Sequence, residues 1–380
     1  MIIGMMGFEF KSPNKGCEAL VYSFLSMILD DLKENTVIYN FSGTDLGDIP
    51  RCFKNIKFVN VRPRLRDIRF RYTRAIMKCD YIFDVTMGDS FSDIYSKNYC
   101  KDLIRHKRIA EFFCDKYILL PQTYGPFEDA ECLKKAGGVF KRAYKIYCRD
   151  GLSKSFIENK YHINDSVLAS DMAFCLPYNK DDFQFGDNKK LGLNVSGLLY
   201  KGGFCKENQF NLKFNYQEFI ERLLAELQKS YEVHLIPHVV DSDENAYDDD
   251  YKICRLLNEK YPKTILAPAF TNPIEAKSYI SNMDVFIGSR MHSTIASFSA
   301  GVPTIPISYS RKFEGLFGSI DYPYVIDAKK ESFESAFKMV FKYLSEIELL
   351  HDRQKKSLEF IDEKNESFKR SIIEIIKGGV

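Results

Sequence analysis

The residues best suited to chemistry follow a short apolar run that ends at Gly288, and they are Arg290, His292 and Ser293. Small residues from Ser293 to Ala300 then predict a helix. The N-terminus of a helix attracts anions because its first N–H groups are unpaired and its dipole is positive there. An arginine adds a planar fork for carboxylate or phosphate, and a histidine can exchange a proton near neutral pH. This pattern predicts a site for a small anion that undergoes acid–base chemistry.

Lys312 strengthens this interpretation, since Arg-x-His at a strand–helix junction is equally typical of a structural cap. The lysine follows a second apolar run, Thr304 to Ser308. Adjacent parallel strands open their C-terminal ends onto the same crevice, so we expect Lys312 to lie near Arg290 and His292. Three cationic or titratable groups in one place favour a binding site over packing alone.

The elements that must position these residues alternate short apolar runs with helical periods along the whole chain, which predicts an α/β protein with largely parallel sheets. The expected strands of the first half are Ile2–Gly7, Val37–Phe41, Ile56–Val61, Tyr81–Val85, Tyr117–Pro121 and Ile146–Cys148. Those of the second half are Leu191–Val195, Val233–Pro237, Ile265–Pro268, Val285–Gly288 and Thr304–Ser308. The clearest expected helices are Glu18–Lys33, Asp93–Cys114 and Ser153–Asn159.

The length of 380 residues is too great for one ordinary core and predicts two domains. The charged, aperiodic segment 177–190 is the best candidate for a linker. We therefore expect Rossmann-like domains at 1–176 and 191–350, facing one another across a cleft that holds the chemistry. A helical segment at 351–380 would end the chain.

Composition argues against several classes of protein. The net charge of +2 is far from the strongly basic balance of a dedicated nucleic-acid binder. No apolar run is long enough to span a membrane, and the first residues lack the basic region of a signal peptide. The ten cysteines include no C-x-x-C pair. We therefore expect reduced thiols, no metal site and a cytoplasmic protein.

A turn at residues 14–18 joins the first expected strand to the first expected helix. Asn14 and Gly16 would let the backbone approach a ligand closely, and Glu18 lies in the first turn of the helix. The segment lacks the glycine spacing of a dinucleotide site and the lysine motif of a P-loop. A plain strand–helix turn is therefore an equal alternative.

Gly88 and Asp89 follow the expected strand Tyr81–Val85 and offer a candidate general base at the edge of a crevice. Asp89 and Asp93 are also typical helix caps, and for Asp93 the cap is the favoured interpretation.

Three further features have a structural alternative beside the functional one. Arg149 ends the last strand of the first half, where it either faces the cleft or pairs with Asp150. Asp171 is either a buried turn former or part of the cleft floor. His234 and His238 lie at the end of a strand of the second half with a spacing that suits no common metal site. We interpret them as cleft rim or ordinary structure.

The segment 62–78 is rich in arginine and interleaved with apolar residues. Such a stretch is typical of contact with an anionic membrane surface or a diphosphate, which would place the protein at the inner face of a membrane. A solvated helix face is the simpler alternative.

Taken together, these motifs resemble the polysaccharide pyruvyl transferase family. The ordered set spans about residues 1–315 and consists of Asn14–Leu20, Gly88–Phe91, Gln122–Pro126, Arg149-Asp150 with Ser153, Asp171–Phe174, Gly288–His292, and Gly301–Pro303 with Tyr309 and Lys312. No single motif is specific, but the ordered set is. Two positions depart from the family pattern: Cys17, where many members have aspartate, and Met87, where a second glycine is common.

The resemblance implies a two-domain fold like that of the GT-B glycosyltransferases, with the acceptor on the N-terminal side and the donor on the C-terminal side. It also implies transfer of pyruvate from phosphoenolpyruvate to two hydroxyls of a sugar as a cyclic ketal, without a cofactor or a metal. In family members the equivalents of Arg149, Arg290, His292 and Lys312 are linked with phosphoenolpyruvate. The acceptor would belong to a capsule or exopolysaccharide, free or linked to a lipid diphosphate.

This reaction needs a general acid and a general base. His292 would protonate the enol methylene, and Asp89, with Glu18 behind it, would accept the hydroxyl proton. The expected substrate-binding residues are Arg149, Arg290, Lys312, Ser293, Asn14, Gly88 and Asp171.

Two other functions are compatible with the sequence. A GT-B-type glycosyltransferase would bind the diphosphate of a nucleotide sugar at the same helix N-terminus, and the fold alone does not separate the two reactions. A degenerate, non-catalytic member could scaffold glycan assembly. Arg-x-His with a distant lysine suits a compact three-carbon anion better than a ribose and base, which argues against the glycosyltransferase. The joint presence of Arg149, Arg290, His292 and Lys312 argues against the degenerate member.

Overall fold

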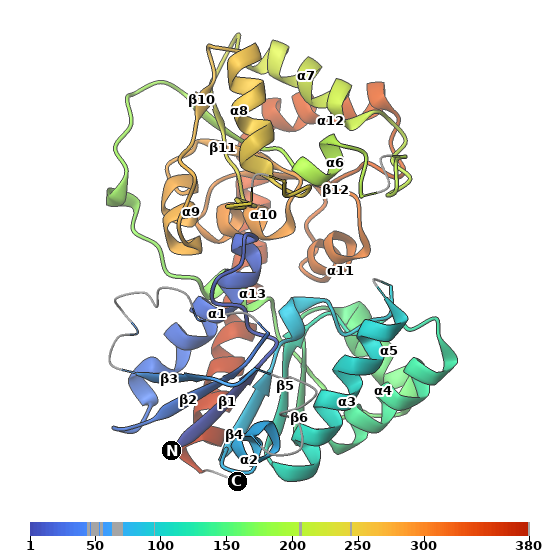
Figure 1. The fold of residues 1–380 in the computed structure, drawn as a ribbon. Helices are drawn as coiled ribbons and strands as arrows, with labels where there is room; N and C mark the ends of the chain where they lie inside the picture. Colours follow the sequence, from blue (N-terminus) through green and yellow to red (C-terminus); the bar gives the residue numbers. More distant parts are fainter. Residues whose placement is uncertain are drawn as a thin grey trace. The chain divides into compact units, whose positions relative to one another are not determined.

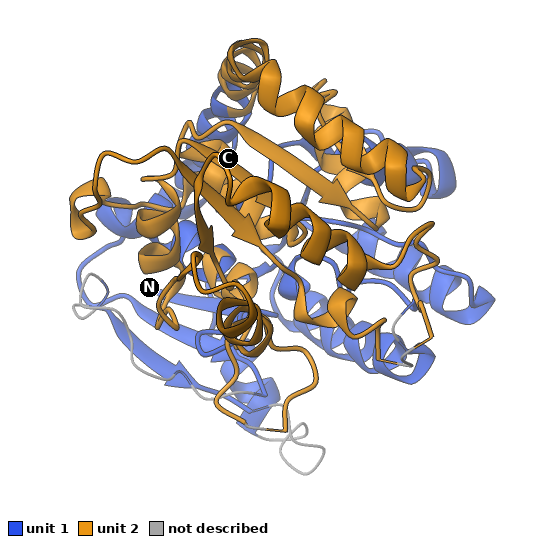
Figure 2. Cartoon of the chain, turned by 90° about the horizontal axis from the view of Figure 1, so that it is seen from above, with its two compact units in different colours: residues 1–12, 20–172, 362–380 blue, residues 13–19, 173–361 orange. Residues whose placement is uncertain are grey.

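The computed structural model describes residues 1–43, 46, 53, 56–62, 71–94, 96–204, 207–243 and 245–378. The chain divides into two compact units, shown in Figure 2. Unit 1 contains Met1–Ser12, Leu20–Met172 and Asp362–Val380, and unit 2 contains Pro13–Ala19 and Ala173–Ile361. Two segments thus belong to a different unit from their neighbours in sequence: 13–19 belongs to unit 2, and the C-terminal end belongs to unit 1.

Unit 1 is built on a seven-stranded parallel sheet in the order β3-β2-β1-β4-β5-β6-β7 (Figure 1). Its strands are β1 (Ile2–Met6), β2 (Val37–Phe41), β3 (Lys57–Asn60), β4 (Tyr81–Asp84), β5 (Tyr117–Gln122), β6 (Lys145–Cys148) and β7 (Val167–Leu168). The central strands β4 and β5 are buried at every position. Helices cover both faces of such a sheet, which is why these strands are continuous apolar runs.

Most helices of unit 1 follow a strand in sequence. The helices are α1 (Lys15–Ile28, whose first residues belong to unit 2), α2 (Thr73–Ile76), α3 (Lys97–Phe113), α4 (Ala130–Arg142), α5 (Gly151–Tyr161) and the end of α13 (Ile347–Lys377), with 3₁₀ turns η1 (Leu29–Asp31) and η4 (Thr86–Gly88). Polar side chains cap α3, α4 and α5. Ser96 caps α3, so the prediction that Asp93 caps it is wrong. The Asp93 carboxylate instead accepts the backbone N–H groups of Glu128 and Asp129, at 3.0 and 2.7 Å.

Unit 2 is built on a six-stranded parallel sheet in the order β10-β9-β8-β11-β12-β13. Its strands are β8 (Lys190–Asn194), β9 (Glu232–Leu235), β10 (Ile265–Leu266), β11 (Val285–Gly288), β12 (Thr304–Ser308) and β13 (Ile326–Asp327). Its helices are α6 (Gly197–Tyr200), α7 (Tyr216–Leu227), α8 (Asp250–Lys260), α9 (Pro273–Ile280), α10 (Met291–Ser299), α11 (Arg311–Ser319), α12 (Phe333–Ser345) and the start of α13, with 3₁₀ turns η5 (Met172–Cys175) and η6 (Lys180–Asp182).

The predicted α/β class is confirmed, and every strand expected from the sequence is present with ends that differ by a residue or two. The edge strands β7 and β13 were not expected, because two residues are too few to show a period. The first helix begins at Lys15 rather than Glu18, which makes the whole turn at 14–18 part of a helix N-terminus.

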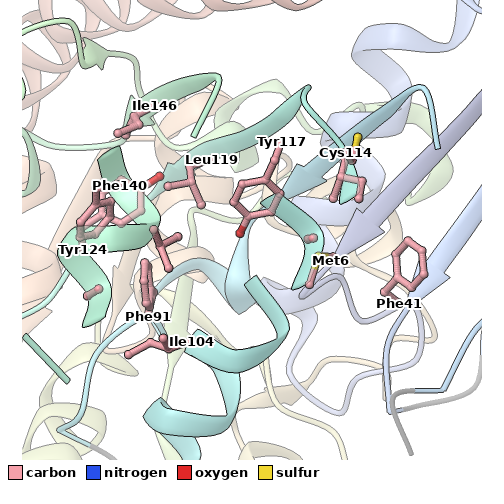
Figure 3. Packing of buried hydrophobic residues seen from close by; sticks show 14 of the residues in the cluster. Met6, Phe41, Phe91, Ile104, Cys114, Tyr117, Leu119, Tyr124, Phe140 and Ile146 are labelled. Carbon is pink, nitrogen blue, oxygen red and sulfur yellow. The ribbon is translucent and has the colours of Figure 1, made fainter. Parts of the chain in front are cut away.

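The core of unit 1 holds the loop after β4 in place (Figure 3). Phe91 comes two residues after Asp89, and its ring packs 5.2 Å from that of Phe140 and 5.4 Å from that of Phe127. Aromatic pairs at these separations add to the burial of apolar surface. The Gly88-Asp89 turn is therefore anchored on a rigid core.

Strand order reverses once in each sheet, between β1 and β4 in unit 1 and between β8 and β11 in unit 2. Ligands of open α/β sheets bind outside the carboxyl ends of the strands at such points. In unit 2 the two strands end side by side, with Asn194 paired to Gly288. The predicted Arg290 and His292 follow this pair directly.

Candidate active site

Arg290 lies two residues beyond β11 and is the N-cap residue of α10. Its guanidinium binds two carboxylates: Nε and Nη2 donate to Asp250, with Nη2 at 2.7 Å from Oδ1, and Nη1 donates to Asp248 at 3.1 Å. Burial raises the pKa of Asp250 although Arg290 acts against this. Asp250 and Asp248 hold the pKa of Arg290 above its ordinary value in spite of burial. The predicted anion-binding arginine is thus itself held by two acids.

Asn194, which was not singled out from the sequence, fixes the turn that carries Arg290. Its side-chain oxygen accepts the backbone N–H of Arg290 at 2.9 Å and the hydroxyl of Ser293 at 3.0 Å. Its amide group donates to the carbonyl of Ile236 at 3.0 Å. The hydroxyl of Ser293, predicted to bind substrate, therefore also orders the helix N-terminus. A polar residue ending a buried strand was the available signal for Asn194.

His292 lies in the first turn of α10, with its ring against Gly16 at the start of α1. A Cβ atom at position 16 would lie 2.6 Å from Cγ of His292, far inside normal contact distance. Asn14 supports this turn because its side-chain oxygen accepts the N–H of Gly16 at 2.9 Å. The structure therefore joins the Asn14–Gly16 turn and His292 into one site.

The segment 13–19 is tied to unit 2 by backbone hydrogen bonds. Lys15 N–H donates to the carbonyl of His238 at 3.0 Å, and Val240 N–H donates to that of Pro13 at 2.9 Å. The Lys15 ammonium and the Glu18 carboxylate form a buried ion pair with a separation of 2.8 Å. Glu18, a predicted base, thus lies in the same unit as His292.

His238 is a site residue that the sequence interpretation left as rim or ordinary structure. It follows β9 directly, is 2% exposed, and neither of its ring nitrogens has a hydrogen-bond partner among the described residues. Burial and the positive charges of His292, Arg290 and Lys15 hold the pKa of His238 well below its usual range. Four basic groups therefore gather at the carboxyl end of the unit 2 sheet.

Lys312 lies in the first turn of α11, which follows β12. Because β12 is the parallel neighbour of β11, this places Lys312 at the same edge of the sheet as Arg290 and His292. The side chain is partly buried.

Arg149 follows β6 in unit 1 and is 3% exposed. Its Nη1 donates to Asp171 at 2.9 Å and its Nε to the Thr123 hydroxyl at 2.8 Å. Asp171, not Asp150, is thus its close partner: Asp150 is 4.0 Å from Nε and caps α5. Within the part of the chain that the structure describes, the buried Nη2 of Arg149 has no hydrogen-bond partner.

Gly88 and Asp89 lie in and directly after η4, beyond the end of β4. Gly88 has a φ of +86°, and a Cβ atom there would lie 3.3 Å from Nη1 of Arg149. Met87 has a φ of +53°, a conformation that favours glycine. This backbone conformation explains why a second glycine is common at this position in the family. In this chain Met87 adopts the same conformation. Asp89 is half-buried beside this turn.

A cavity of about 360 Å³ opens at the carboxyl ends of β1, β2 and β4 within unit 1, which the sequence did not reveal. Its wall includes Lys107, whose ammonium lies 2.7 Å from the Asp84 carboxylate and 2.5 Å from the Thr86 hydroxyl. Burial lowers the pKa of Lys107. The rest of the lining is largely apolar and includes Phe41 and Tyr72.

Three predictions concern features outside these clusters. Within the basic stretch 62–78, residues 63–70 lie outside the described residues. The remainder contains the short helix α2, in which Ile76 is buried, and Tyr72 directly before it is buried too. In the described ranges, three or more histidine, cysteine or acidic side chains nowhere gather in a way that could hold a metal. None of the described helices has both the length and the apolar character needed to cross a membrane.

The structure thus collects the predicted residues in two groups. Unit 2 holds Asn14, Glu18, Arg290, His292, Ser293 and Lys312, and unit 1 holds Gly88, Asp89, Arg149 and Asp171. A sequence model of the polysaccharide pyruvyl transferase family matches residues 14–311, which include all of them except Lys312, the residue directly after the matched range. This chain belongs to that family.

The amylovoran biosynthesis protein AmsJ of Erwinia amylovora is 21% identical over 267 residues. The match covers 67% of this chain and 62% of AmsJ.

Solved structures confirm the predicted GT-B-like fold. A glycosyltransferase from Rickettsia africae superimposes with a TM-score of 0.60 at 11% identity, covering 99% of this chain and 97% of that one. A UDP-forming trehalose-phosphate synthase from Burkholderia vietnamiensis gives a TM-score of 0.53 at 10% identity, covering 99% of both chains. At these identities the likeness concerns the fold alone.

Proposed function

We propose that this protein transfers pyruvate from phosphoenolpyruvate to two hydroxyls of a sugar in a polysaccharide or glycan precursor, forming a cyclic ketal and releasing phosphate. The observation that carries the proposal is the basic cluster of unit 2. There His292, able to give a proton, lies against Gly16 and among His238, Arg290 and Lys15. Membership of the polysaccharide pyruvyl transferase family supports the same reaction.

Phosphoenolpyruvate carries a phosphate and a carboxylate, so its site needs several cations and amide donors. Lys312 and the first turn of α10 meet this need at one edge of the unit 2 sheet. Within unit 1, Nη2 of Arg149 has no hydrogen-bond partner among the described residues, so it can donate to an anionic oxygen of a substrate. Arg290 can bind the donor if the half-buried Asp248 yields its place, while the fully buried Asp250 keeps the guanidinium in position.

The chemistry starts with His292 as general acid. Its proton adds to the methylene carbon and makes a methyl group, which leaves an oxocarbenium-like centre at the carbon that bears phosphate. A sugar hydroxyl adds to that carbon and loses its proton to a base. Phosphate then leaves with the electrons of the C–O bond and takes up a proton, and the second hydroxyl adds and releases its own. Fixed cations stabilise the charge that develops on phosphate.

Asp89 is the leading candidate for the base. Glu18 is second, because its carboxylate already binds the Lys15 ammonium at 2.8 Å. Asp89 lies directly after η4, beyond the end of β4, and Phe91 anchors this turn on the core of unit 1. No cofactor takes part in this scheme.

We assign the acceptor to unit 1, where the cavity beside Lys107 offers apolar walls and a few polar groups. Such a lining is typical of small-molecule sites. The acceptor would be a capsule or exopolysaccharide unit, and a lipid-diphosphate link would give the arginine-rich segment 62–78 a membrane surface to bind at the inner face.

The test is calorimetric titration with phosphoenolpyruvate beside UDP and GDP sugars, repeated on Arg290→Ala and Arg290→Lys. We expect binding of phosphoenolpyruvate alone, weakened in both variants. The lysine variant keeps the positive charge beside Asp250, so it separates lost binding from lost folding. Binding of a nucleotide sugar with indifference to phosphoenolpyruvate would instead establish a glycosyltransferase.

A further inference from the structure

The imidazole of His238 is buried in the basic cluster of unit 2 and is 2% exposed. No described residue forms a hydrogen bond with either ring nitrogen. Buried polar side chains in native proteins nearly always have a partner, and each exception calls for an explanation. A polar ring left in this condition costs stability, so its presence points to a ligand rather than to packing.

The backbone around His238 is fixed from two sides. Its own N–H donates to Asp250 at 3.2 Å, and the next N–H, of Val239, donates to the same oxygen at 3.1 Å. Its carbonyl accepts the N–H of Lys15 at 3.0 Å. The hydrogen bonds that hold His238 among the described residues are therefore those of its main chain, and both ring nitrogens remain able to bind a ligand.

We propose that His238 binds the donor, with a ring N–H donating a hydrogen bond to a phosphate or carboxylate oxygen of phosphoenolpyruvate. This inference rests on the proposed function. In this role the neutral ring of His238 supplies a hydrogen bond in a site whose other groups are charged or act as the acid.

The charges around His238 explain why an anion is the fitting ligand. Lys15, which is paired with Glu18, acts on it from α1, Arg290 and His292 act from the N-terminus of α10, and Asp250 of α8 accepts its backbone N–H. Burial and the three positive neighbours keep the ring neutral, so it offers one N–H donor and one acceptor. A bound anion acts in the opposite direction and raises the pKa of His238. Donor binding should therefore be accompanied by proton uptake.

His234 supplies a matched control from β9, the strand that precedes His238. It is as deeply buried, but Nδ1 lies 2.7 Å from the Tyr279 hydroxyl and Nε2 lies 3.1 Å from the Glu232 carboxylate. Both of its nitrogens are therefore used by the protein itself. A structural histidine and a ligand-binding histidine should respond differently to the same substitution.

The experiment compares His238→Phe with His234→Phe by thermal unfolding and by calorimetric titration with phosphoenolpyruvate. His238→Phe should leave the unfolding temperature unchanged or raise it, because no hydrogen bond is lost, and should weaken donor binding by about tenfold or more. His234→Phe should lower the unfolding temperature and, at a temperature where it stays folded, keep the affinity of the wild type.

His238→Asn is the second variant, and it keeps the inference testable if phenylalanine does not fit. Asparagine retains an N–H group but does not titrate. His238→Asn should therefore bind phosphoenolpyruvate better than His238→Phe does. It should also abolish proton uptake, which is measured by titration in buffers of different ionisation enthalpy. Wild-type affinity and wild-type proton uptake in a folded His238→Asn would overturn the role of His238 alone. Failure of the wild-type protein to bind phosphoenolpyruvate would overturn the proposed function as well.

Discussion

The two units each bury an arginine at the carboxyl end of a parallel strand. The two guanidinium groups differ in their hydrogen-bond partners. Arg290 in unit 2 donates from all three nitrogens to the carboxylates of Asp248 and Asp250. Arg149 in unit 1 donates to one carboxylate, that of Asp171, and to one hydroxyl, that of Thr123. Its third nitrogen has no partner within the described residues.

This difference separates two ways of using a buried cation. In unit 1 the pairing is incomplete, so Arg149 can take an anionic oxygen without breaking a bond. In unit 2 all three nitrogens of Arg290 are paired, so Arg290 can take an anionic oxygen only if a carboxylate such as Asp248 yields its place. Equivalent positions in two similar sheets therefore do not imply equivalent roles, because the partners of each arginine decide what it can still bind.

The largest expected effect concerns His292 of unit 2, the proposed general acid. His292→Ala should lower kcat by about two to four orders of magnitude, with a much smaller change in KM, because general acid catalysis acts in the transition state. Steady-state kinetics with phosphoenolpyruvate and a sugar acceptor measure both. Near-normal turnover would rule out His292 as the acid, and unit 2 would then differ from unit 1 only in how its arginine is paired.

Arg149→Ala should be next in size. It leaves Asp171 buried without its cation, which is expected to lower the free energy of unfolding by about 3–5 kcal/mol. Urea unfolding measures this loss. Arg149→Lys keeps the charge and should regain much of the stability. It lacks the forked guanidinium, so the affinity for phosphoenolpyruvate should stay low. Wild-type affinity in Arg149→Lys would show that the third nitrogen is not used.

The ring of His238, which has no hydrogen-bond partner in the described part of the chain, should make stability depend on pH in a way that the paired arginines do not. Its pKa in the folded protein lies well below the unfolded value of about 6.5, so below that pH the unfolded chain binds more protons. Stability should therefore fall on acidification by about 1.4 kcal/mol per pH unit for this one group. Unfolding of wild type and His238→Phe from pH 7 to 5 should show a shallower loss in the variant. Parallel curves would contradict the assignment.

The smallest effect should come from weakening the complete pairing of Arg290. Asp248 is the more exposed partner, with 27% of its side chain accessible. Asp248→Asn should tighten phosphoenolpyruvate binding by about three- to tenfold, because one competing negative charge is removed. The gain should disappear when Arg290→Lys is combined with it, as a double-mutant cycle would show. Unchanged affinity in the single variant would show that Arg290 only positions its neighbours.

Local patterns were enough to predict the elements that carry the site. The apolar run before Gly288 and the small residues after His292 predicted β11 and α10, and the structure has both. The same holds for β4 before Gly88 and for β6 before Arg149. These predictions succeed because a buried parallel strand and a helix each impose a period that can be read from neighbouring residues.

The partners of those residues were beyond the reach of such patterns. Arg290 finds its acids 40 and 42 residues earlier in the chain, and Arg149 is paired with Asp171 rather than with its neighbour Asp150. His238 gave no signal beyond following a strand, since a buried histidine with satisfied nitrogens, such as His234, has the same sequence context.

By itself the sequence determined the strands, the helices and which side chains stand at the ends of those strands, because these depend on short-range periodicity and on turn residues. Only the tertiary structure decided which charges meet. Gly16 lies against His292, and Lys15 beside His238, because the strand order β9-β8-β11 and the backbone bonds of segment 13–19 bring them together. A buried charge or ring takes its properties from these distant neighbours, and no local pattern records them.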